Sequence, residues 1–424
     1  MKILVSGASV TGPVLAYWLA RYGFEVTVVE RAPALRKAAG HAVDLFRPAM
    51  EIVEKMGVLE PVTARRTGTD WLTFHREGHP RPIEVELRRV VAAVSDRHVE
   101  IMRDDLSEIL YEATRHDAGY VFGDSIAAIS DDGEVRFDSG REERFDLVIG
   151  ADGLHSNVRR LVFGPEERFT HWIGAYLAVA SVPNFLGLDG RMEGMVGEGW
   201  MAAVYSAAHM DDARAGFFFR TPKQLDYHHR DVPRQKELLR ERFGGLGWQV
   251  PRILDELDRT PAFYMDSITQ LRLGTWSRGR VTLAGDAGYC PGPAVGGSTS
   301  LAVVGAYVLA GELAAYGGDH LRAFPAYEAE IGEYVRRSRT FALRAARGIV
   351  PAGRFELLAL TYGARLVNHL PVALTKAATR LGSKGMRLHD SIALKDYGEA
   401  VRPALPGTAA SPPPPATGPT LTGR

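Results

Sequence analysis

Three glycine-containing stretches hold most of the residues whose types and spacing suit chemistry. They are SGASVTGP (residues 6–13), GADGLHSNVR (residues 150–159) and LAGDAGYCPGPAVGGSTS (residues 283–300). In each, glycine lets the backbone approach a ligand closely, and a helix start or a carboxylate is placed to bind it. The sequence offers no catalytic triad and no metal-ligand constellation. We therefore predict that the three stretches bind a cofactor, and we assign no catalytic side chain.

The first stretch lies within a strand, helix and strand unit. Residues 2–5 have the pattern of a buried strand, residues 14–22 have helical apolar spacing, and residues 24–29 have the pattern of a second strand. Gly7 suits the tight turn, Gly12 lets helix and strand pack closely, and the helix N-terminus offers free N–H groups to a pyrophosphate. The unit predicts a dinucleotide site; the alternative is a purely structural α/β unit.

The residues around this unit narrow the choice of ligand. Ser9 occupies the middle glycine position of the usual fingerprint, and Pro13 lies at the helix start. Glu30 closes the second strand about 20 residues on, where a carboxylate accepts hydrogen bonds from a ribose and disfavours a 2′-phosphate. We therefore expect FAD or NAD. Arg31 and Lys37 are basic candidates for a cofactor phosphate, with a solvated charged surface as the alternative.

Arg103 follows the apolar residues 99–102 and precedes an amphipathic helix. A cation is unfavourable beside the positive end of a helix dipole. This position favours a ligand-binding role over that of a plain surface charge.

The second stretch follows a buried strand at residues 147–149. Asp152 and Gly153 lie just beyond it, where a carboxylate suits ligand hydroxyls or orients a basic side chain, and a simple turn is the alternative. Ser156 is predicted to cap a helix that begins at Asn157.

The third stretch follows a short strand at residues 281–284. Gly285 and Asp286 break the strand, and a glycine- and proline-rich loop leads to a helix that opens near Ser298. The loop residues that we expect beside a ligand are Pro293, Gly296 and Gly297.

The pattern changes to short antiparallel strands in residues 71–96 and to long antiparallel strands in residues 166–267, which predicts a second domain. Phe217 and Phe219 share one face of a strand because successive side chains alternate. Together with Tyr205 they are candidates for the floor of a pocket for a flat apolar substrate; plain core is the alternative.

Composition limits the other possibilities. Among 424 residues, 51 basic and 51 acidic side chains give zero net charge, which argues against nucleic acid as a partner. The single cysteine, Cys290, suits a reducing cytoplasm and is interpreted as a packing residue. No targeting or transmembrane segment is visible. Further helices are expected at residues 223–243, 320–350 and 353–394, and a disordered proline-rich tail at residues 401–424.

In this order, the three stretches resemble the FAD-dependent monooxygenases of the p-hydroxybenzoate hydroxylase family, the single-component flavoprotein hydroxylases. The resemblance covers about residues 1–390. It implies an α/β fold in which a β-rich substrate domain interrupts a Rossmann-like FAD-binding domain, with a C-terminal helical region at residues 331–400 and then the tail. The FAD-binding domain would comprise residues 1–70, 97–165 and 268–330, and the substrate domain residues 71–96 and 166–267.

The resemblance also implies residue roles. Gly7, Gly12 and Glu30 match the turn and the acceptor that bind the ADP part of FAD. Asp152 and Gly153 match a motif associated with both the FAD pyrophosphate and the nicotinamide cofactor.

On the flavin side, Arg103 matches an arginine that contacts FAD, and Asp286 after Gly285 matches the acceptor for the ribityl chain. Residues 40–45 (GHAVDL) are similar to a segment of the branch that acts on tetracyclines and other polyketides, where Asp44 would fall near the flavin. The loop and helix start near the flavin pyrimidine would be Pro293, Gly296, Gly297 and Ser298.

The family chemistry implies that NADH or NADPH binds transiently and reduces tightly bound FAD. O2 then adds at C4a of the flavin, and the hydroperoxide transfers one oxygen to an aromatic or polyketide-like small molecule. The alternatives are a flavin-dependent reductase similar to geranylgeranyl reductases and a flavin-binding partner without turnover. Candidates for polarising a substrate hydroxyl are His41, Arg47, Tyr205 and Arg220.

Overall fold

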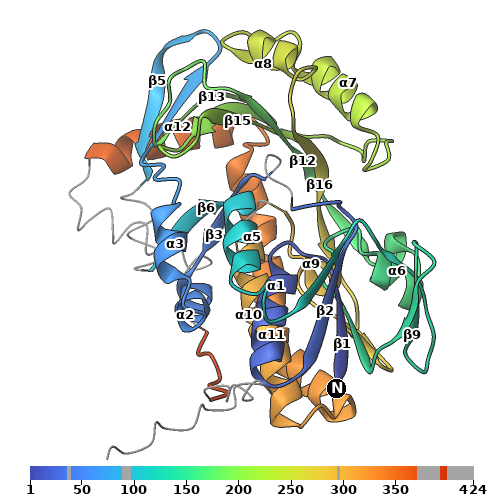
Figure 1. Ribbon diagram of the computed structural model, residues 1–424. Helices are drawn as coiled ribbons and strands as arrows, with labels where there is room; N and C mark the ends of the chain where they lie inside the picture. The colour runs from blue at the N-terminus through green and yellow to red at the C-terminus, as the bar shows by residue number, and fades with distance from the viewer. Residues whose placement is uncertain (36–39, 88–96, 294–296, 370–391, 399–424) are drawn as a thin grey trace, which may run out of the picture.

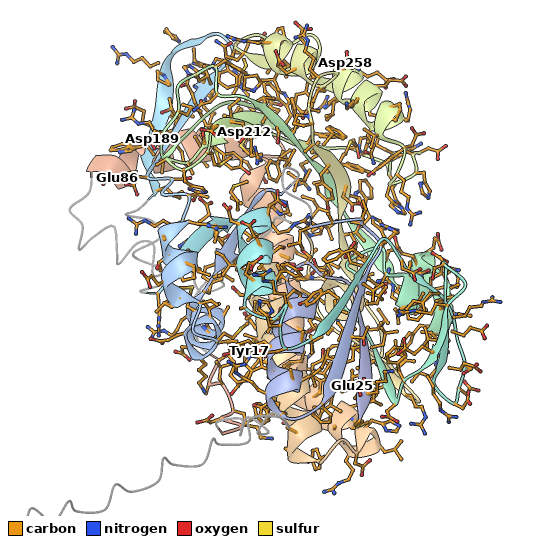
Figure 2. All side chains as sticks on the ribbon, in the orientation of Figure 1. Tyr17, Glu25, Glu86, Asp189, Asp212 and Asp258 are labelled. Carbon is orange, nitrogen blue, oxygen red and sulfur yellow. The ribbon has the colours of Figure 1, made fainter. Side chains whose placement is uncertain are left out.

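The computed structural model describes residues 1–35, 40–87, 97–293, 297–369 and 392–398. Lys37, Gly296 and the predicted tail at residues 401–424 fall outside these ranges. The chain is a mixed α/β protein with a parallel sheet at one end and a larger, mostly antiparallel sheet at the other (Figure 1). Figure 2 marks the two ends by Glu25, on the parallel sheet, and Asp258, just beyond helix α8. The α/β class expected from the sequence is confirmed.

The parallel sheet has the strand order β17-β18-β11-β1-β2-β7, in which only β17 is antiparallel to its neighbour. Its strands are β1 (Lys2–Ser6), β2 (Glu25–Glu30), β7 (Gly119–Phe122), β11 (Leu147–Gly150), β17 (Ser277–Arg278) and β18 (Val281–Leu283). Ser6 pairs with Gly150, and Gly150 pairs with Leu283. Each is the last residue of its strand, so the three glycine stretches leave the sheet side by side.

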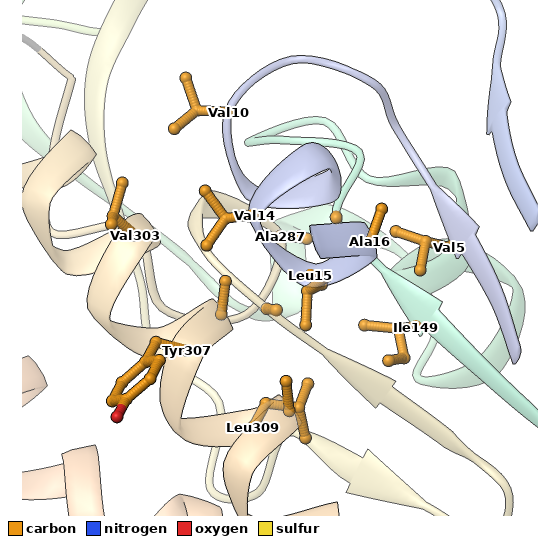
Figure 3. Close-up of a cluster of buried hydrophobic side chains, with 14 of the residues drawn as sticks. Val5, Val10, Val14, Leu15, Ala16, Ile149, Ala287, Val303, Tyr307 and Leu309 are labelled. Atoms are coloured by element: carbon orange, nitrogen blue, oxygen red, sulfur yellow. The ribbon is translucent and has the colours of Figure 1, made fainter. Parts of the chain in front are cut away.

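Helices α1 (Thr11–Arg21) and α10 (Ser298–Ala315) pack with this sheet into the main hydrophobic core. Figure 3 shows side chains that meet there: Val5, Val14, Leu15, Ile149, Val303 and Tyr307. Helix α10 is long and apolar enough to cross a membrane, but 78% of it is buried inside the protein. Its apolar surface therefore belongs to the core. Helix α11 (His320–Ile349) lies along α10 and confirms the helix expected at residues 320–350.

The second sheet has the order β16-β12-β15-β14-β13-β4-β5, and only β13 and β4 pair in parallel. Its strands are β4 (Trp71–Arg76), β5 (His79–Glu86), β12 (Thr170–Pro183), β13 (Arg191–Gly197), β14 (Trp200–Ser206), β15 (Asp212–Arg220) and β16 (Phe263–Leu271). Two segments far apart in the sequence therefore join in one sheet.

Helices α7 (Val232–Phe243) and α8 (Val250–Glu256) cover the outer face of this sheet (Figure 1). The helix expected at residues 223–243 forms only in its second half. It starts at Val232 because the Asp231 carboxylate accepts a hydrogen bond from the Arg234 N–H at 3.1 Å. Of the helix expected at residues 353–394, the described part is α12 (Arg354–His369). Residues 370–391 lie outside the described ranges, and residues 392–398 are not helical.

Shorter elements complete the fold. Strands β3 (Ala42–Leu45) and β6 (Val99–Met102) pair with one another and lie between the large sheets in Figure 1. Strands β8 (Ile126–Ile129), β9 (Glu134–Phe137) and β10 (Glu142–Arg144) form a small sheet. The remaining elements are α2 (Arg47–Lys55), α3 (Leu59–Ala64), α5 (Arg103–Glu112), α6 (Asn157–Val162), the 3₁₀ turn η1 (Glu166–Arg168) and α9 (Asp286–Tyr289).

Candidate functional site

The three glycine stretches touch one another at the carboxyl edge of the parallel sheet. Gly7 has a left-handed φ of +110°, and a Cβ there would lie 2.5 Å from the Ala151 carbonyl oxygen. Gly285 has a φ of +63°, and its Cβ would lie 2.4 Å from the Thr11 Oγ1. Atoms this close would overlap. The first stretch therefore contacts the other two only because glycine occupies these positions.

Gly12 approaches the backbone most closely, since a Cβ there would lie 1.8 Å from the Gly7 carbonyl oxygen. We expect Gly12→Ala to lower the free energy of unfolding by about 3 kcal/mol or more, because neither backbone segment can move aside. The matched control is Gly274→Ala, where a Cβ would meet nothing within 4 Å; its change should stay within about 0.5 kcal/mol. Urea unfolding followed by circular dichroism measures both, and equal stabilities would contradict the close approach.

The Glu30 carboxylate stabilises the first glycine turn through hydrogen bonds. Its Oε2 accepts a hydrogen bond from the Ala8 N–H at 3.0 Å, and its Oε1 accepts one from the Ala32 N–H at 2.9 Å. A carboxylate offers about four lone-pair positions, so acceptors for ribose hydroxyls remain. Arg31 beside it is exposed, and the exposed Ser9 places its hydroxyl 3.2 Å from the Ser107 Oγ on α5.

Two helices begin at this edge without a side-chain cap. Helix α1 begins without a side-chain cap, Pro13 is buried in its first turn, and the N–H groups of residues 9–11 make no hydrogen bond within the described chain. Helix α10 begins at Ser298, after Gly297 with φ of +83°, and also lacks a side-chain cap. Such N–H groups and the positive dipole end bind phosphates and other anions. Both helix starts fit an anionic cofactor that contains a pyrophosphate.

A buried carboxylate lies near the start of α10, and the charge of an arginine acts on it. The Asp286 carboxylate accepts a hydrogen bond from the Ser298 hydroxyl at 2.8 Å. Burial raises the pKa of Asp286, and Ser298, the Cys290 thiol and the charge of Arg103 partly offset this rise. The Arg103 guanidinium makes no hydrogen bond or ion pair with another described residue. These groups therefore suit the polar atoms of a ligand. Pro293, which follows them in the third stretch, is also buried.

Asp152 lies at the N-terminus of α6. Its Oδ2 accepts hydrogen bonds from the N–H groups of Asn157 at 2.8 Å and Val158 at 3.1 Å, and the Ser156 hydroxyl donates to its other oxygen. Ser156 is the N-cap of this helix, as the sequence predicted. Asp152 therefore orders the turn after β11, and Gly153 leaves open space where a side chain would project.

Arg159 is a residue of the site that the sequence analysis did not single out. Its side chain is 0% exposed, and its Nη1 donates to the Ala287 carbonyl oxygen at 2.9 Å. Its Nη2 donates to the Leu154 carbonyl oxygen at 2.5 Å and to the Glu166 Oε2 at 2.6 Å. Arg159 thus joins the second glycine stretch to the third. The only signal for Arg159 in the sequence is its place in the second stretch. An arginine is rarely buried unless it has partners, and the sequence does not show these partners.

Strand β3 is tied to the first turn of α10 by Ser300. The Ser300 hydroxyl donates to the Asp44 carbonyl oxygen at 3.0 Å and accepts from the Phe46 N–H at 2.9 Å. The Asp44 carboxylate lies 2.7 Å from the His98 Nε2. Asp44 is therefore held beside the open end of α10.

His41, at the start of the same segment, offers an unpartnered polar atom. Its Nδ1 is buried and has no hydrogen-bond partner in the described chain, while its carbonyl oxygen accepts from the Arg103 N–H at 3.1 Å. Burial and then the charge of Arg103 lower the pKa of His41 to about 3. The ring is therefore neutral at physiological pH, and its Nδ1 suits a ligand.

The aromatic candidates lie on opposite faces of the seven-stranded sheet. Phe217 and Phe219 are 0% and 1% exposed and pack against Phe243 of α7, with ring centroids 4.8 and 5.7 Å away. This placement contradicts their predicted role in the substrate pocket, because α7 and α8 cover that face. Tyr205 lies on the inner face, where its hydroxyl accepts from the Ala42 N–H at 3.1 Å.

Small residues occupy the centre of this inner face. Gly194, Ala203 and Gly216 are paired across β13, β14 and β15. A Cβ at Gly216 would meet nothing within 4 Å. At Gly194, by contrast, a Cβ would lie 2.7 Å from the Ala203 Cβ, so the open space above the sheet lies at Gly216.

Comparison with known proteins agrees with this geometry. Residues 1–330 match a protein-family model described as an FAD binding domain. An uncharacterised protein of Mycobacterium tuberculosis is 44% identical over 342 residues, which cover 80% of this chain and 91% of that protein. A flavin-dependent monooxygenase of Legionella longbeachae is 38% identical over 346 residues, which cover 81% and 88% of the two chains.

The fold also matches a solved structure over almost its whole length. The crystal structure of the tetracycline destructase Tet(51) has a TM-score of 0.78 and 31% sequence identity to this chain. The match covers 94% of this chain and 99% of that one.

Proposed function

Because this chain belongs to the FAD binding domain family and is an FAD-dependent monooxygenase, we propose that it inserts one oxygen atom from O2 into an aromatic or polyketide-like molecule. NADH or NADPH is the reductant. The observation that carries the proposal is the pairing of the strand ends Ser6, Gly150 and Leu283, which brings the three glycine stretches to one edge of the parallel sheet. The destructase is named for tetracycline, a flat fused-ring compound, and this supports the polyketide-like substrate class.

The residues described above divide into two groups that hold FAD. Glu30 and the free N–H groups of the first turn bind the ADP part. Asp286, Arg103 and the N-terminus of α10 bind the flavin part. When bound, FAD takes electrons from the nicotinamide cofactor and activates O2 for transfer to the substrate. The nicotinamide cofactor binds transiently, because the first turn is already taken by the ADP part of FAD.

The chain itself contributes orientation and exclusion of water. We assign the parallel sheet to an FAD-binding part and the seven-stranded sheet to a substrate part, which is the interrupted arrangement expected from the sequence. The inner face of the seven-stranded sheet supplies an apolar surface with space at Gly216. The neutral His41 places a nitrogen lone pair or N–H group at the buried edge, where it orients a substrate hydroxyl. We place the protein in the cytoplasm, a compartment that suits its free cysteine.

A substrate screen tests the proposal. The purified protein should be yellow, and phenolic or polyketide compounds should accelerate its oxidation of NADH or NADPH. Mass spectrometry should then find one added oxygen atom in the product, and this atom should carry the label when isotopically labelled O2 is supplied. Turnover that persists without O2 would instead support the flavin-dependent reductase, and a folded protein that binds no FAD would end the proposal.

A further inference from the structure

A charged network leads from the second glycine stretch to the substrate sheet, and the roles assigned above do not use it. His155 lies between two carboxylates. Its Nδ1 is 2.8 Å from the Glu166 Oε1, and its Nε2 is 2.9 Å from the Asp266 Oδ2. Glu166 belongs to η1, whereas Asp266 is a 4% exposed residue of β16 on the inner face of the sheet. One imidazole therefore connects the two parts of the molecule.

The Asp266 end of the network reaches the site. The Tyr264 hydroxyl donates to the Asp266 Oδ2 at 3.3 Å, and the Tyr264 ring lies 6.2 Å from the His41 ring at an interplanar angle of 21°. Burial and the charge of Asp266 raise the pKa of Tyr264 well above its usual value, and the charges of Arg103 and Asp286 also act on it. Tyr264 therefore stays protonated and lies near the residues that we assign to the flavin.

The Glu166 end of the network reaches the same site through Arg159. Glu166 Oε2 accepts a hydrogen bond from Arg159 at 2.6 Å, and Arg159 donates to the Ala287 carbonyl oxygen at 2.9 Å. Ala287 directly follows Asp286 in α9. His155 is thus connected through one carboxylate to Tyr264 and through the other to the turn that carries Asp286.

The groups around His155 keep it charged at physiological pH. Burial lowers its pKa, but the hydrogen bonds to Asp266 and Glu166 outweigh burial and raise the pKa to about 9. His229 stacks on it with centroids 3.9 Å apart, and burial followed by the charge of His155 lowers the pKa of His229 to about 4. His228 and Arg230 act on His229 in the same direction. The stacked ring is therefore neutral, and the cation between the carboxylates is His155.

We propose that the charged His155 is a positioning residue of the oxygenation site, which fixes Tyr264 through Asp266 and the Asp286 turn through Glu166 and Arg159. The inference rests on the proposed function, because it takes this edge to be the flavin site. Both carboxylates lose their bridging cation when His155 loses its proton. The pKa of His155 is raised above its usual 6.5, so its contribution is complete below about pH 6.5 and disappears as the pH rises through about 9.

FAD titration of the apoprotein tests this without any substrate. We expect the dissociation constant for the wild type to rise as the pH passes about 9. At neutral pH, His155→Gln should bind FAD about tenfold more weakly, as expected for a lost charged hydrogen bond, and should show no such step. The matched control is His75→Gln, which removes a histidine–carboxylate bond to Glu193, also of 2.9 Å, that joins β4 and β13. His75→Gln should behave like the wild type. An unchanged affinity in a folded His155→Gln protein would overturn the proposal.

If His155→Gln does not fold, the wild-type titration still decides. A dissociation constant for FAD that stays level through about pH 9, with an unchanged circular dichroism spectrum, would overturn the proposed positioning role of His155. A wild-type protein that binds FAD but oxygenates no compound would overturn the proposed function. The FAD titration would still test the role of His155, because it needs no substrate.

A double-mutant cycle tests the connection to Tyr264. Tyr264→Phe keeps the ring beside His41 and removes the hydroxyl that bonds Asp266. If His155 acts through this hydroxyl, the loss of kcat/KM in the double variant should be much smaller than the product of the two single losses. The single variants should also lower kcat more than they raise KM, and His155→Gln should lose the alkaline limb of the pH profile. Independent, multiplicative losses would show that His155 and Tyr264 do not act together.

Discussion

In Asp286→Ala, the dissociation constant for FAD is expected to rise about 10- to 150-fold. This corresponds to about 1.5–3 kcal/mol, the usual contribution of a hydrogen bond to a charged group. The Asp286 carboxylate already accepts the Ser298 hydroxyl at 2.8 Å, which holds it at the first turn of α10. A ribityl hydroxyl would be a second donor to the same group. The measurement is a titration of apoprotein with FAD, followed by the flavin fluorescence.

The stability of the apoprotein separates a binding role from a folding role. Burial raises the pKa of Asp286, so ionising this group opposes folding as the pH rises through its folded value. Asp286→Ala apoprotein should therefore be at least as stable as the wild type at neutral pH, although it gains less stability from added FAD. Ser298→Ala is the control for the protein's own hydrogen bond and should weaken FAD binding less than Asp286→Ala does. Equal FAD affinity in wild type and Asp286→Ala would place the ribityl acceptor elsewhere.

Local sequence was sufficient to predict the elements that carry the three glycine stretches. In each stretch the strand end, the glycine and the helix start lie within a few residues of one another. Each of the strands that end at Ser6, Gly150 and Leu283 can therefore be recognised from its own local sequence. Their order along the chain then predicts the family, which the match over residues 1–330 confirms. The sequence could not provide the contact between Gly285 and Thr11, because it depends on how β18 and β1 are placed in the sheet.

Phe217 and Phe219, which were expected to floor a substrate pocket, lie on the face of the seven-stranded sheet that α7 and α8 cover. The alternation of side chains correctly places Phe217 and Phe219 together and Phe218 opposite. One face of this sheet is covered by α7 and α8, and part of the other packs against α11, so both faces carry apolar residues. Alternation alone cannot then say which face meets a ligand. We base the proposed substrate face on the small residues Gly194, Ala203 and Gly216, whose alignment becomes visible only when the strands are paired.

Buried charges were the least predictable part of the site. Asp152 was recognised as a ligand candidate, but its hydrogen bonds to the start of α6 come from residues of the same stretch. His155 and Arg159 find their partners at Asp266 and Ala287, more than a hundred positions away in the sequence. A charge that is buried only because distant elements bring its counter-ions leaves no periodic pattern in the chain.

Arg159→Met is expected to lower the free energy of unfolding of the apoprotein by about 3 kcal/mol or more. The substitution keeps much of the side-chain volume and removes every donor, so it leaves the Ala287 and Leu154 carbonyl oxygens without their arginine and Glu166 without one of its two cations. Removing one partner of a buried ion pair costs about 3–5 kcal/mol, and Glu166 is partly exposed, which places the expectation at the lower end. Urea unfolding monitored by circular dichroism measures it.

Two further variants show whether the loss comes from the unpaired charge. Arg160→Met changes the next residue of the same helix. Its guanidinium is exposed and, among the described residues, bonds the Asn157 side chain alone, at 2.7 Å; the effect of the substitution should stay within about 0.5 kcal/mol. Adding Glu166→Gln to Arg159→Met removes the carboxylate charge that the arginine had balanced, so part of the stability should return. If both arginine variants lost the same stability, helix propensity rather than the buried charge would explain the result. A double variant less stable than Arg159→Met would mean that the Glu166 bond to His155, and not the bond to Arg159, carries the greater part of the energy.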